Sequence, residues 1–273
     1  CLPFQALGEV PDRTPVTKRM SAFPPRIGCL PCAPVSLSKR GERHGVGCYA
    51  PRAMTTPADT SFDPHCRLCP RLAEFLAEGK RQYPQYHCAP VAPFGDPDAR
   101  LLIVGLAPGF HGANATGRPF TGDYAGILLY ETLYAFGLST APQSVAADDN
   151  LRLIGCRISN SVKCVPPGNK PMPAEIATCN RYLAHELAGV KEGTVLLALG
   201  AIAHGAVLRA LGLKQSAFAF THGAEHALPR NLTMVDSYHC SRYNTNTRRL
   251  TADMFRTVVA RAAQRARGLS DYP

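Results

Sequence analysis

The sequence has no tryptophan, and only 18% of its 273 residues are charged, with 20 Asp and Glu against 30 Lys and Arg. The lack of tryptophan excludes nothing. No apolar run approaches the roughly 18 residues of a membrane-spanning helix, so we expect no membrane partner. The opening CLPFQALGEVPDR has no continuous apolar stretch of the kind found in a secretory signal peptide, so we expect none.

The shortage of acidic residues leaves a formal net charge of +10. Such a balance attracts polyanions, nucleic acid first, although it is also common in proteins without such a partner. Eleven cysteines can form disulfides or bind metal. Because their number is odd and no secretion signal is expected, we predict reduced thiols, some of them ligands, in a cytoplasmic protein of bacterial type.

Residues 1–55 differ in composition from the rest of the chain. They hold eight Lys and Arg, three Asp and Glu and eight prolines, and therefore half of the net charge. Because no apolar periodicity is visible, we predict a flexible basic tail ahead of one domain at 56–273. Met54 is a candidate for the natural start of the protein.

Within this tail, three cysteines and one histidine follow the spacing C-x2-C-x11-H-x3-C. Three thiolates and one imidazole can bind zinc. Because no helix or strand pattern frames these residues, we favour chance spacing in a cysteine-rich tail over a zinc site. The four residues are Cys29, Cys32, His44 and Cys48.

From residue 56 onward, segments with helical periodicity alternate with short apolar runs typical of buried strands. This alternation predicts an α/β fold with a mainly parallel sheet. Active sites of such sheets lie at the carboxyl ends of the strands, where segments 105–123, 160–170 and 238–249 follow expected strands. We expect helices at 66–80, 124–138, 173–190, 201–213 and 250–267, and strands at 100–106, 156–164, 194–200 and 231–239.

The segment GLAPGFHGANATGRPFTGD, residues 105–123, is unusually rich in small residues. It holds five glycines, two prolines and one carboxylate, Asp123. Without Cβ atoms, backbone amides can approach a nucleobase or a phosphate closely. The alternative is a plain strand-to-helix turn that needs small residues for packing.

Four further cysteines follow the spacing C-x2-C-x94-C-x14-C. Four thiolates can hold zinc or an iron–sulfur cluster, which here would join the first helix to the middle of the fold. The alternative is that some of them are ordinary buried cysteines. They are Cys66, Cys69, Cys164 and Cys179.

Three motifs together resemble the uracil-DNA glycosylases, specifically the iron–sulfur-containing, broad-specificity family 5 enzymes. The motifs are GLAPGFHGANATGRPFTGD, NSVKCVPPGNKPMP with Cys179, and YHCSRYNTNTRRLT, and the resemblance covers about residues 63–267. It implies a three-layer α/β/α sandwich around a short parallel sheet. It also implies a structural 4Fe–4S cluster on the four cysteines and excision of uracil from DNA in base excision repair.

Two positions depart from the family pattern. Related iron–sulfur glycosylases have an acid directly after the first glycine of the loop, where this chain has Leu106, followed by Ala107. The water-activating acid is therefore missing from that position, as the family 5 pattern allows. The later motif commonly reads His-Pro-Ser, whereas here it is His239, Cys240 and Ser241.

Three polar side chains are the candidate catalytic residues. Asp123 can orient or deprotonate water and offset positive charge on the sugar, or it can cap the helix at 124–138. His239, as a neutral donor, can stabilise negative charge on the departing base, or it is a structural histidine. Asn160 can read the edge of uracil through its amide, or it satisfies a turn.

The substrate-binding candidates lie mainly in the glycine-rich loop. Phe120 can stack on an extruded base, although a core phenylalanine is the alternative. His111 can contact a phosphate or the base. The full set is Gly105, Ala107, Pro108, Gly109, His111, Phe120, Asn160 and His239.

The segment SRYNTNTRRLT at 241–251 is the candidate DNA-contacting loop. Arginines there can contact phosphates while a bulky side chain fills the gap left by the extruded base. A solvated charged loop is the alternative. The candidates are Ser241, Arg242, Tyr243, Arg248 and Arg249.

Three functions remain open from the sequence. The first is a monomeric, monofunctional glycosylase that removes uracil, and also hypoxanthine or xanthine if the pocket is permissive, from damaged DNA. The second is a glycosylase-fold protein that binds damaged or single-stranded DNA without turnover, since the usual acid is absent. The third is a basic iron–sulfur protein that binds nucleic acid and has unrelated chemistry.

Overall fold

The structure is a computed structural model that describes residues 61–268. The expected tail and its C-x2-C-x11-H-x3-C residues lie outside this range. The elements are α1 (Pro70–Gln82), β1 (Phe94–Gly95), β2 (Leu101–Gly105), α2 (Ala113–Thr116), α3 (Tyr124–Ala135), β3 (Cys156–Asn160), α4 (Pro173–Gly189), β4 (Val195–Leu199), α5 (Ala201–Ala210), β5 (Glu225–Leu228), β6 (Leu232–Ser237), α6 (Arg242–Asn246) and α7 (Ala252–Ala266). Short 3-10 turns lie at Pro167–Asn169 and Gln215–Ala217.

A six-stranded mixed sheet forms the centre of the fold, in the order β1-β3-β2-β4-β6-β5. The four inner strands run parallel, while β1 and β5 pair antiparallel at the two edges. The predicted parallel sheet is thus confirmed for the inner strands. The two edge strands were not predicted, because β1 has only two residues and β5, EHAL, has no apolar run.

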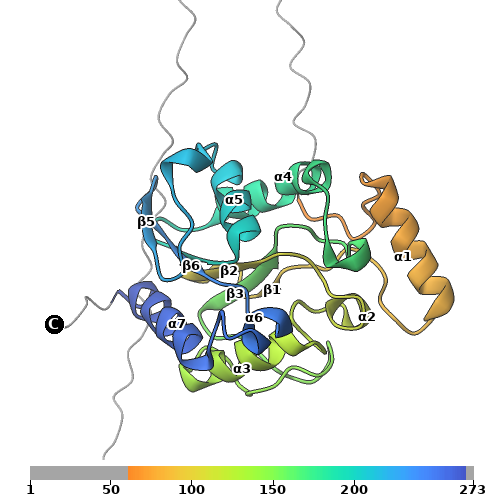
Figure 1. The fold of residues 1–273 in the computed structure, drawn as a ribbon, viewed down its shortest axis with the longest axis horizontal. Coiled ribbons are helices and arrows are strands. Elements are labelled where there is room, and N and C mark those ends of the chain that lie inside the picture. Colours follow the sequence, from red (N-terminus) through yellow and green to blue (C-terminus); the bar gives the residue numbers. More distant parts are fainter. Residues whose placement is uncertain (1–60, 269–273) are drawn as a thin grey trace, which may run out of the picture. The chain divides into compact units, whose positions relative to one another are not determined.

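Helices cover both faces of this sheet and make three layers, as the predicted sandwich requires (Figure 1). Because side chains alternate along a strand, β2 supplies both cores. Leu101 and Ile103 face the core that contains residues of α3 and α7. Leu102 and Val104 face the core that contains residues of α4 and α5.

Local signals set where several helices begin. In α4, Pro173 occupies the first turn and Glu175 accepts a 2.7 Å hydrogen bond from the Met172 amide, as a capping box does. The first helix begins at Pro70 rather than at residue 66, because Cys69 lies at its N-cap in an extended conformation. The strand expected at 156–164 ends at Asn160, and a bend follows in which the Ser161 amide still bonds the Gly105 carbonyl.

Four parallel strands end at one edge of the sheet, so the segments that follow them meet there. Those segments include the glycine-rich loop after β2, the loop after β3 and the segment from Tyr238 after β6. Within residues 61–268, no helix is long and apolar enough to cross a membrane.

Candidate functional site: a cavity at the strand ends and a cysteine centre

The carboxyl ends of β2, β4 and β6 border a cavity of about 550 Å³, which we call the strand-end cavity. Its lining comes from segments 106–109, 123–125, 199–202 and 238–249, together with Asn169 and Phe220. All three segments expected to leave strands at this edge therefore contribute to one cavity.

Asp123 lines the strand-end cavity and also caps α3. Its Oδ1 accepts a 2.9 Å hydrogen bond from the Gly126 amide. Its Oδ2 lies only 2.7 Å from where a Cβ on Gly112 would stand, so the neighbouring glycine leaves room for the carboxylate. Burial raises the pKa of Asp123, against the opposing effect of the capping amides. The two interpretations of Asp123, cap and cavity carboxylate, therefore hold for the same residue.

His239 lies two residues beyond β6 and lines the same cavity. Burial lowers its pKa to about 4, so the imidazole is neutral at physiological pH. Its backbone carbonyl accepts a 2.8 Å hydrogen bond from the Asn244 side chain, which holds the turn into α6. The site thus contains a neutral imidazole that can donate one hydrogen bond.

Gly105, Phe120 and Asn160 form a buried group next to His239. A Cβ on Gly105 would stand 2.4 Å from Asn160 Oδ1 and 2.6 Å from Phe120 Cζ, so only glycine fits between them. The Phe120 ring stacks on the His239 ring, with centroids 5.9 Å apart. Phe120 is 6% exposed and Asn160 3%, and neither lines the strand-end cavity.

Asn160 carries an unsatisfied polar atom in this group. Among the described residues, nothing donates a hydrogen bond to its buried Oδ1. Buried amide oxygens are nearly always paired in folded proteins, and an orphan of this kind calls for an explanation. An acceptor without a donor marks a place where a ligand N–H can bind.

The departure from the family pattern at residue 106 is visible in the cavity wall. Leu106 lines the strand-end cavity with an apolar side chain. Among the described residues that line this cavity, Asp123 is the single carboxylate. Any base catalysis by a carboxylate at this site therefore falls to Asp123.

Basic and aromatic residues border the cavity. The Arg242 guanidinium lies 5.0 Å from the centre of the Tyr124 ring, and that of Arg249 lies 4.7 Å from the centre of the Tyr238 ring. Both arginines line the cavity, as does Ser241, which caps α6. The mouth of the cavity is therefore positively charged.

Three other candidates lie outside the cavity lining, whereas Ala107, Pro108 and Gly109 are part of it. Tyr243 is 72% exposed on α6, and Arg248 is exposed nearby. His111 is exposed, and its Nδ1 lies 3.0 Å from the Tyr86 hydroxyl within a group of aromatic rings. The structure does not bring His111 into the cavity.

The cavity also contains residues that the sequence did not single out. Gly200 lies between β4 and α5, and Ile202 lies in the first turn of α5, at a fourth strand end that the alternation of elements could have indicated. Phe220 precedes the edge strand β5, and no local pattern marks it. Tyr238 and Asn244 flank predicted residues and carried no separate signal.

The four predicted cysteine ligands line a second, small cavity, which shares no lining residue with the strand-end cavity. We call them the cysteine centre. Cys66 and Cys69 precede α1, Cys164 follows β3, and Cys179 lies in α4. The Lys163 amide donates to Cys179 Sγ over 3.2 Å.

Burial raises the pKa of three of these thiols, those of Cys69, Cys164 and Cys179, and neighbouring thiolate charges raise them further. Burial raises the pKa of Cys164, and the charges of Cys179, Cys66 and Cys69 raise it further. Burial raises the pKa of Cys179 to about 11. Gathered thiolates become favourable when a cation neutralises them, so this donor set fits a thiolate-bound metal centre.

The distances among the four sulfurs help to distinguish a single zinc ion from an iron–sulfur cluster. Within residues 61–268, only His204, His226 and Asp236 place three ligand atoms within 4.8 Å of one another. The four sulfurs are therefore spread more widely than the ligands of one zinc ion, whose zinc–sulfur bonds measure about 2.3 Å. A wider set of thiolates suits a cluster of several metal ions.

Comparison with known proteins agrees with the motifs. Residues 92–263 match the model of the uracil DNA glycosylase superfamily. A protein of Thermus thermophilus named type-5 uracil-DNA glycosylase is 48% identical over 206 residues, which cover 74% of this chain and 94% of that protein. A protein of the same name from Pyrobaculum aerophilum is 41% identical over 203 residues, covering 73% of this chain and 88% of that protein.

A more distant relative is a protein of Thermotoga maritima named type-4 uracil-DNA glycosylase. It is 37% identical over 110 residues, which cover 40% of this chain and 49% of that protein. The type-5 matches are thus both longer and more similar. With its strand-end cavity, its motifs and these matches, the chain belongs to the uracil DNA glycosylase superfamily.

Proposed function

We propose that this protein hydrolyses the N-glycosidic bond of deoxyuridine in DNA, as a monofunctional glycosylase of base excision repair. One observation carries the proposal: a carboxylate and a neutral imidazole, Asp123 and His239, line one cavity at the strand ends of a glycosylase fold. The names of the type-5 relatives support the same substrate. Because the target base is stacked in DNA, the nucleotide must first be extruded into the cavity.

His239 stabilises the leaving base. As the glycosidic bond breaks, the base departs with negative charge on its ring and carbonyl oxygens. A neutral imidazole donates a hydrogen bond to such an oxygen, and burial keeps His239 neutral by lowering its pKa to about 4. Donors placed in advance in this way favour the transition state over the ground state.

Asp123 positions and activates the attacking water. The sugar gains positive charge as the base departs, and a carboxylate nearby both offsets this charge and accepts a proton from water. The raised pKa of Asp123 brings it closer to working pH, which favours proton transfer. The Gly126 amide holds Oδ1, so the carboxylate is fixed in one orientation.

Asn160 and Phe120, in the buried group next to His239, recognise the base. The unpaired Asn160 Oδ1 requires a donor, and the ring N–H of uracil supplies one. Hypoxanthine and xanthine also place a ring N–H beside a carbonyl, whereas cytosine and adenine have a bare nitrogen there. Guanine and thymine carry the same ring N–H, so Asn160 distinguishes uracil, hypoxanthine and xanthine only from cytosine and adenine. The finer specificity we propose is for these three deaminated bases, with Phe120 stacking on the base.

The basic rim holds the DNA backbone. Arg242 and Arg249 line the cavity mouth, each against an aromatic ring that limits its motion. Arginines so placed can bind the phosphates on either side of an extruded nucleotide. Exposed Tyr243 can fill the space that the base leaves in the duplex.

The cysteine centre holds a 4Fe–4S cluster in this proposal. Cys66, Cys69, Cys164 and Cys179 are the ligands, and the Lys163 amide donates to one of their sulfurs. The cluster, when bound, supplies a cross-link among α1, the segment after β3 and α4. Because none of the four cysteines lines the strand-end cavity, we assign the cluster a structural role. About four irons and four sulfides per chain in metal and sulfide analysis would support it, and zinc alone would refute it.

A second candidate function follows from Leu106. With an apolar residue at the position of the usual acid, the protein can act as a binder of damaged or single-stranded DNA that turns over slowly. One experiment separates the two candidates. The full chain is incubated with a uracil-containing oligonucleotide and then treated with alkali, which cleaves abasic sites.

The glycosylase proposal predicts alkali-dependent cleavage at uracil and none at thymine in the matched strand. It also predicts cleavage at hypoxanthine and xanthine but not at adenine or cytosine. Retarded migration of the uracil strand without any abasic product would favour the binding function instead. If the uracil strand were neither cleaved nor retarded, both candidate functions would be contradicted.

A further inference from the structure

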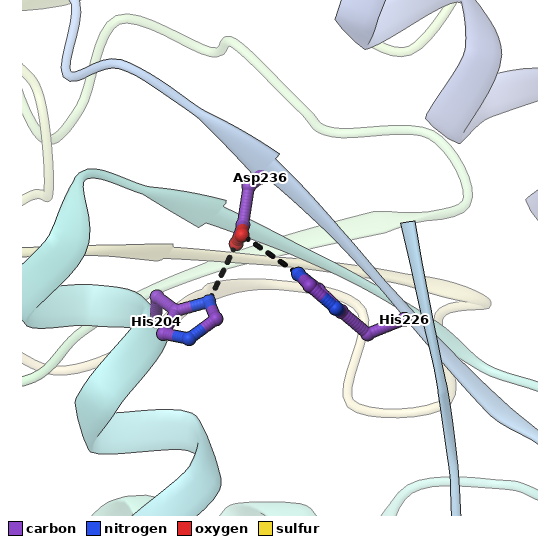
Figure 2. Close-up of side chains that lie close together, drawn as sticks. All are labelled: His204, His226 and Asp236. Carbon is purple, nitrogen blue, oxygen red and sulfur yellow. Dashed lines mark hydrogen bonds and ion pairs between the residues drawn. The ribbon is translucent and has the colours of Figure 1, made fainter. Parts of the chain in front are cut away.

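Two histidines and one aspartate meet behind the wall of the strand-end cavity. His204 of α5, Asp236 of β6 and His226 of β5 point their side chains toward one another, as Figure 2 shows. Asp236 Oδ1 lies 2.9 Å from His204 Nδ1, and Asp236 Oδ2 lies 2.9 Å from His226 Nε2. None of the three lines the strand-end cavity.

This His-Asp-His group is deeply buried. The side chains of His204, His226 and Asp236 are 5%, 12% and 0% exposed. A buried carboxylate is strongly destabilising unless positive charge or several hydrogen bonds offset it. A cation bound at this place would therefore offset the charge of the buried Asp236 carboxylate.

The protons of His204 cannot all be assigned in the neutral form. Its Nδ1 faces Asp236 Oδ1, and its Nε2 faces the Phe218 carbonyl at 3.0 Å. Both partners are acceptors, yet a neutral imidazole carries only one N–H. A neutral His204 can therefore donate to only one of these two acceptors.

A divalent metal ion removes this difficulty. His204 then uses the lone pair of Nδ1 as a ligand and donates Nε2–H to the Phe218 carbonyl, the outer-shell arrangement that metal-bound histidines usually adopt. His226 Nε2 and the Asp236 carboxylate complete three ligand atoms that lie within 4.8 Å of one another. We propose that His204, His226 and Asp236 bind one divalent metal ion of the zinc class.

The donor set indicates the class of ion. Two imidazoles and one carboxylate suit zinc and its neighbours among the transition metals, whereas magnesium and calcium prefer oxygen ligands alone. The cysteine centre offers only sulfur, so the two sites differ in chemistry as well as in position. Three protein ligands leave one position of a tetrahedral zinc ion for water.

The neighbours of the group suggest that its ion is structural. The Phe220 ring packs edge-on against His204, with centroids 5.6 Å apart, and Phe220 lines the strand-end cavity. The Gly223 amide bonds the Asp236 carbonyl over 2.8 Å, so the segment that carries Phe220 is tied to β6. An ion here joins α5, β5 and β6 behind one wall of the cavity.

The test compares two histidine variants of the full chain. His226→Gln removes one ligand at the most exposed member of the group. His87→Gln is the matched control, an exposed histidine with a single backbone partner outside both cavities and the cysteine centre. Each protein is treated with chelator, supplied with Zn²⁺, dialysed and analysed for zinc and iron, and its Tm is measured with and without Zn²⁺.

We expect wild type and His87→Gln to hold about one zinc per chain more than His226→Gln, with equal iron in all three. Zn²⁺ at 100 times its Kd should raise the Tm of the first two by about 5 °C or more, and that of His226→Gln by clearly less. Equal zinc contents and equal Tm shifts in all three proteins would overturn the proposal. His204, His226 and Asp236 would then form a hydrogen-bonded group without a metal ion.

A second measurement covers the case in which His226→Gln fails to fold. Wild type is loaded with Co²⁺ after chelation, and the absorption difference before and after loading is recorded. Cobalt on nitrogen and oxygen ligands gives visible bands without a thiolate-to-cobalt transition, and we expect that spectrum at one equivalent. A thiolate transition alone, or no visible change, would overturn the proposal.

Discussion

The strand-end cavity and the cysteine centre are built from opposite kinds of group. The cavity places one carboxylate, one neutral imidazole and backbone amides on segments that follow parallel strands. The cysteine centre gathers four thiols, of which those of Cys164 and Cys179 are buried, on segments before α1, after β3 and in α4. We infer that residues of the cavity perform the reaction and that the cysteine centre stabilises the fold. Variants in the cavity should therefore lose excision rate, whereas variants in the cysteine centre should lose iron and stability.

The largest effect should come from Asp123→Asn. Asparagine keeps an oxygen for the Gly126 amide, so α3 stays capped, but it cannot accept a proton from water. We expect single-turnover excision of uracil to fall about 10²- to 10⁴-fold, the range of one general base. The measured quantity is the rate of abasic-site formation under excess enzyme.

The same variant should not lose stability. Because burial raises the pKa of Asp123, the charged form destabilises the folded state at neutral pH. The variant should therefore unfold at the same Tm as wild type or higher. Asp253→Asn, at a 93% exposed side chain on α7, is the matched control. Near-normal excision by Asp123→Asn would reduce Asp123 to a helix cap.

The next effect is expected for His239→Gln. Glutamine can still donate a hydrogen bond but does not reproduce the position or the ring stacking on Phe120. We expect excision to fall about 10²- to 10³-fold, as for the loss of one oxyanion donor. Binding of the uracil strand in gel-shift assays should change little, and a parallel loss of binding and excision would contradict the assigned role.

The opposite pattern is expected for Cys164→Ser in the cysteine centre. It should lose iron and stability, with a Tm lower by about 5 °C or more, while residual folded protein keeps excision within tenfold of wild type. Cys156→Ala is the control, a buried core cysteine outside the cysteine centre whose sulfur donates to the Leu138 carbonyl. A Cys164→Ser protein with normal Tm and no excision would break the proposed division between the two regions.

The smallest effect concerns the basic rim of the cavity. Each phosphate contact adds to the salt dependence of DNA binding, so Arg249→Ala should lower the slope of log K against log salt by about one. Affinity should fall similarly for uracil-containing and undamaged strands. Arg256→Ala on α7, outside the cavity lining, serves as the control. An unchanged slope would place the DNA elsewhere.

Much of the fold could be predicted because its inner elements carry strong periodic signals. The run LLIVG of β2 is buried on both faces, and Pro173 with Glu175 marks the start of α4. The edge strands β1 and β5 could not be predicted, since short strands at the edge of a sheet need no apolar run. Their positions depend on backbone pairing with β3 and β6.

The candidate site residues also include some that the sequence could predict and some that it could not. Segments that contribute several neighbouring residues to the strand-end cavity, such as 105–123 and 238–249, could be identified from their sequence motifs. Other functional candidates are single residues on separate segments, so no spacing in the sequence predicts them. They are Phe220, which lines the cavity, and the group of His204, His226 and Asp236. His111 belongs to the loop 105–123, yet it does not line the cavity and its Nδ1 lies 3.0 Å from the Tyr86 hydroxyl, so membership of the loop does not by itself place a side chain in the cavity.

The most direct test of the central claim is the pH dependence of single-turnover uracil excision, in wild type and in Asp123→Asn. Asp123 must be ionised to accept a proton, and burial raises its pKa, whereas His239 stays neutral down to about pH 4. We predict that the wild-type rate already falls above pH 4 as the pH drops, because Asp123 becomes protonated there, and that this fall is absent in the variant. An identical acid limb in both proteins would contradict the account.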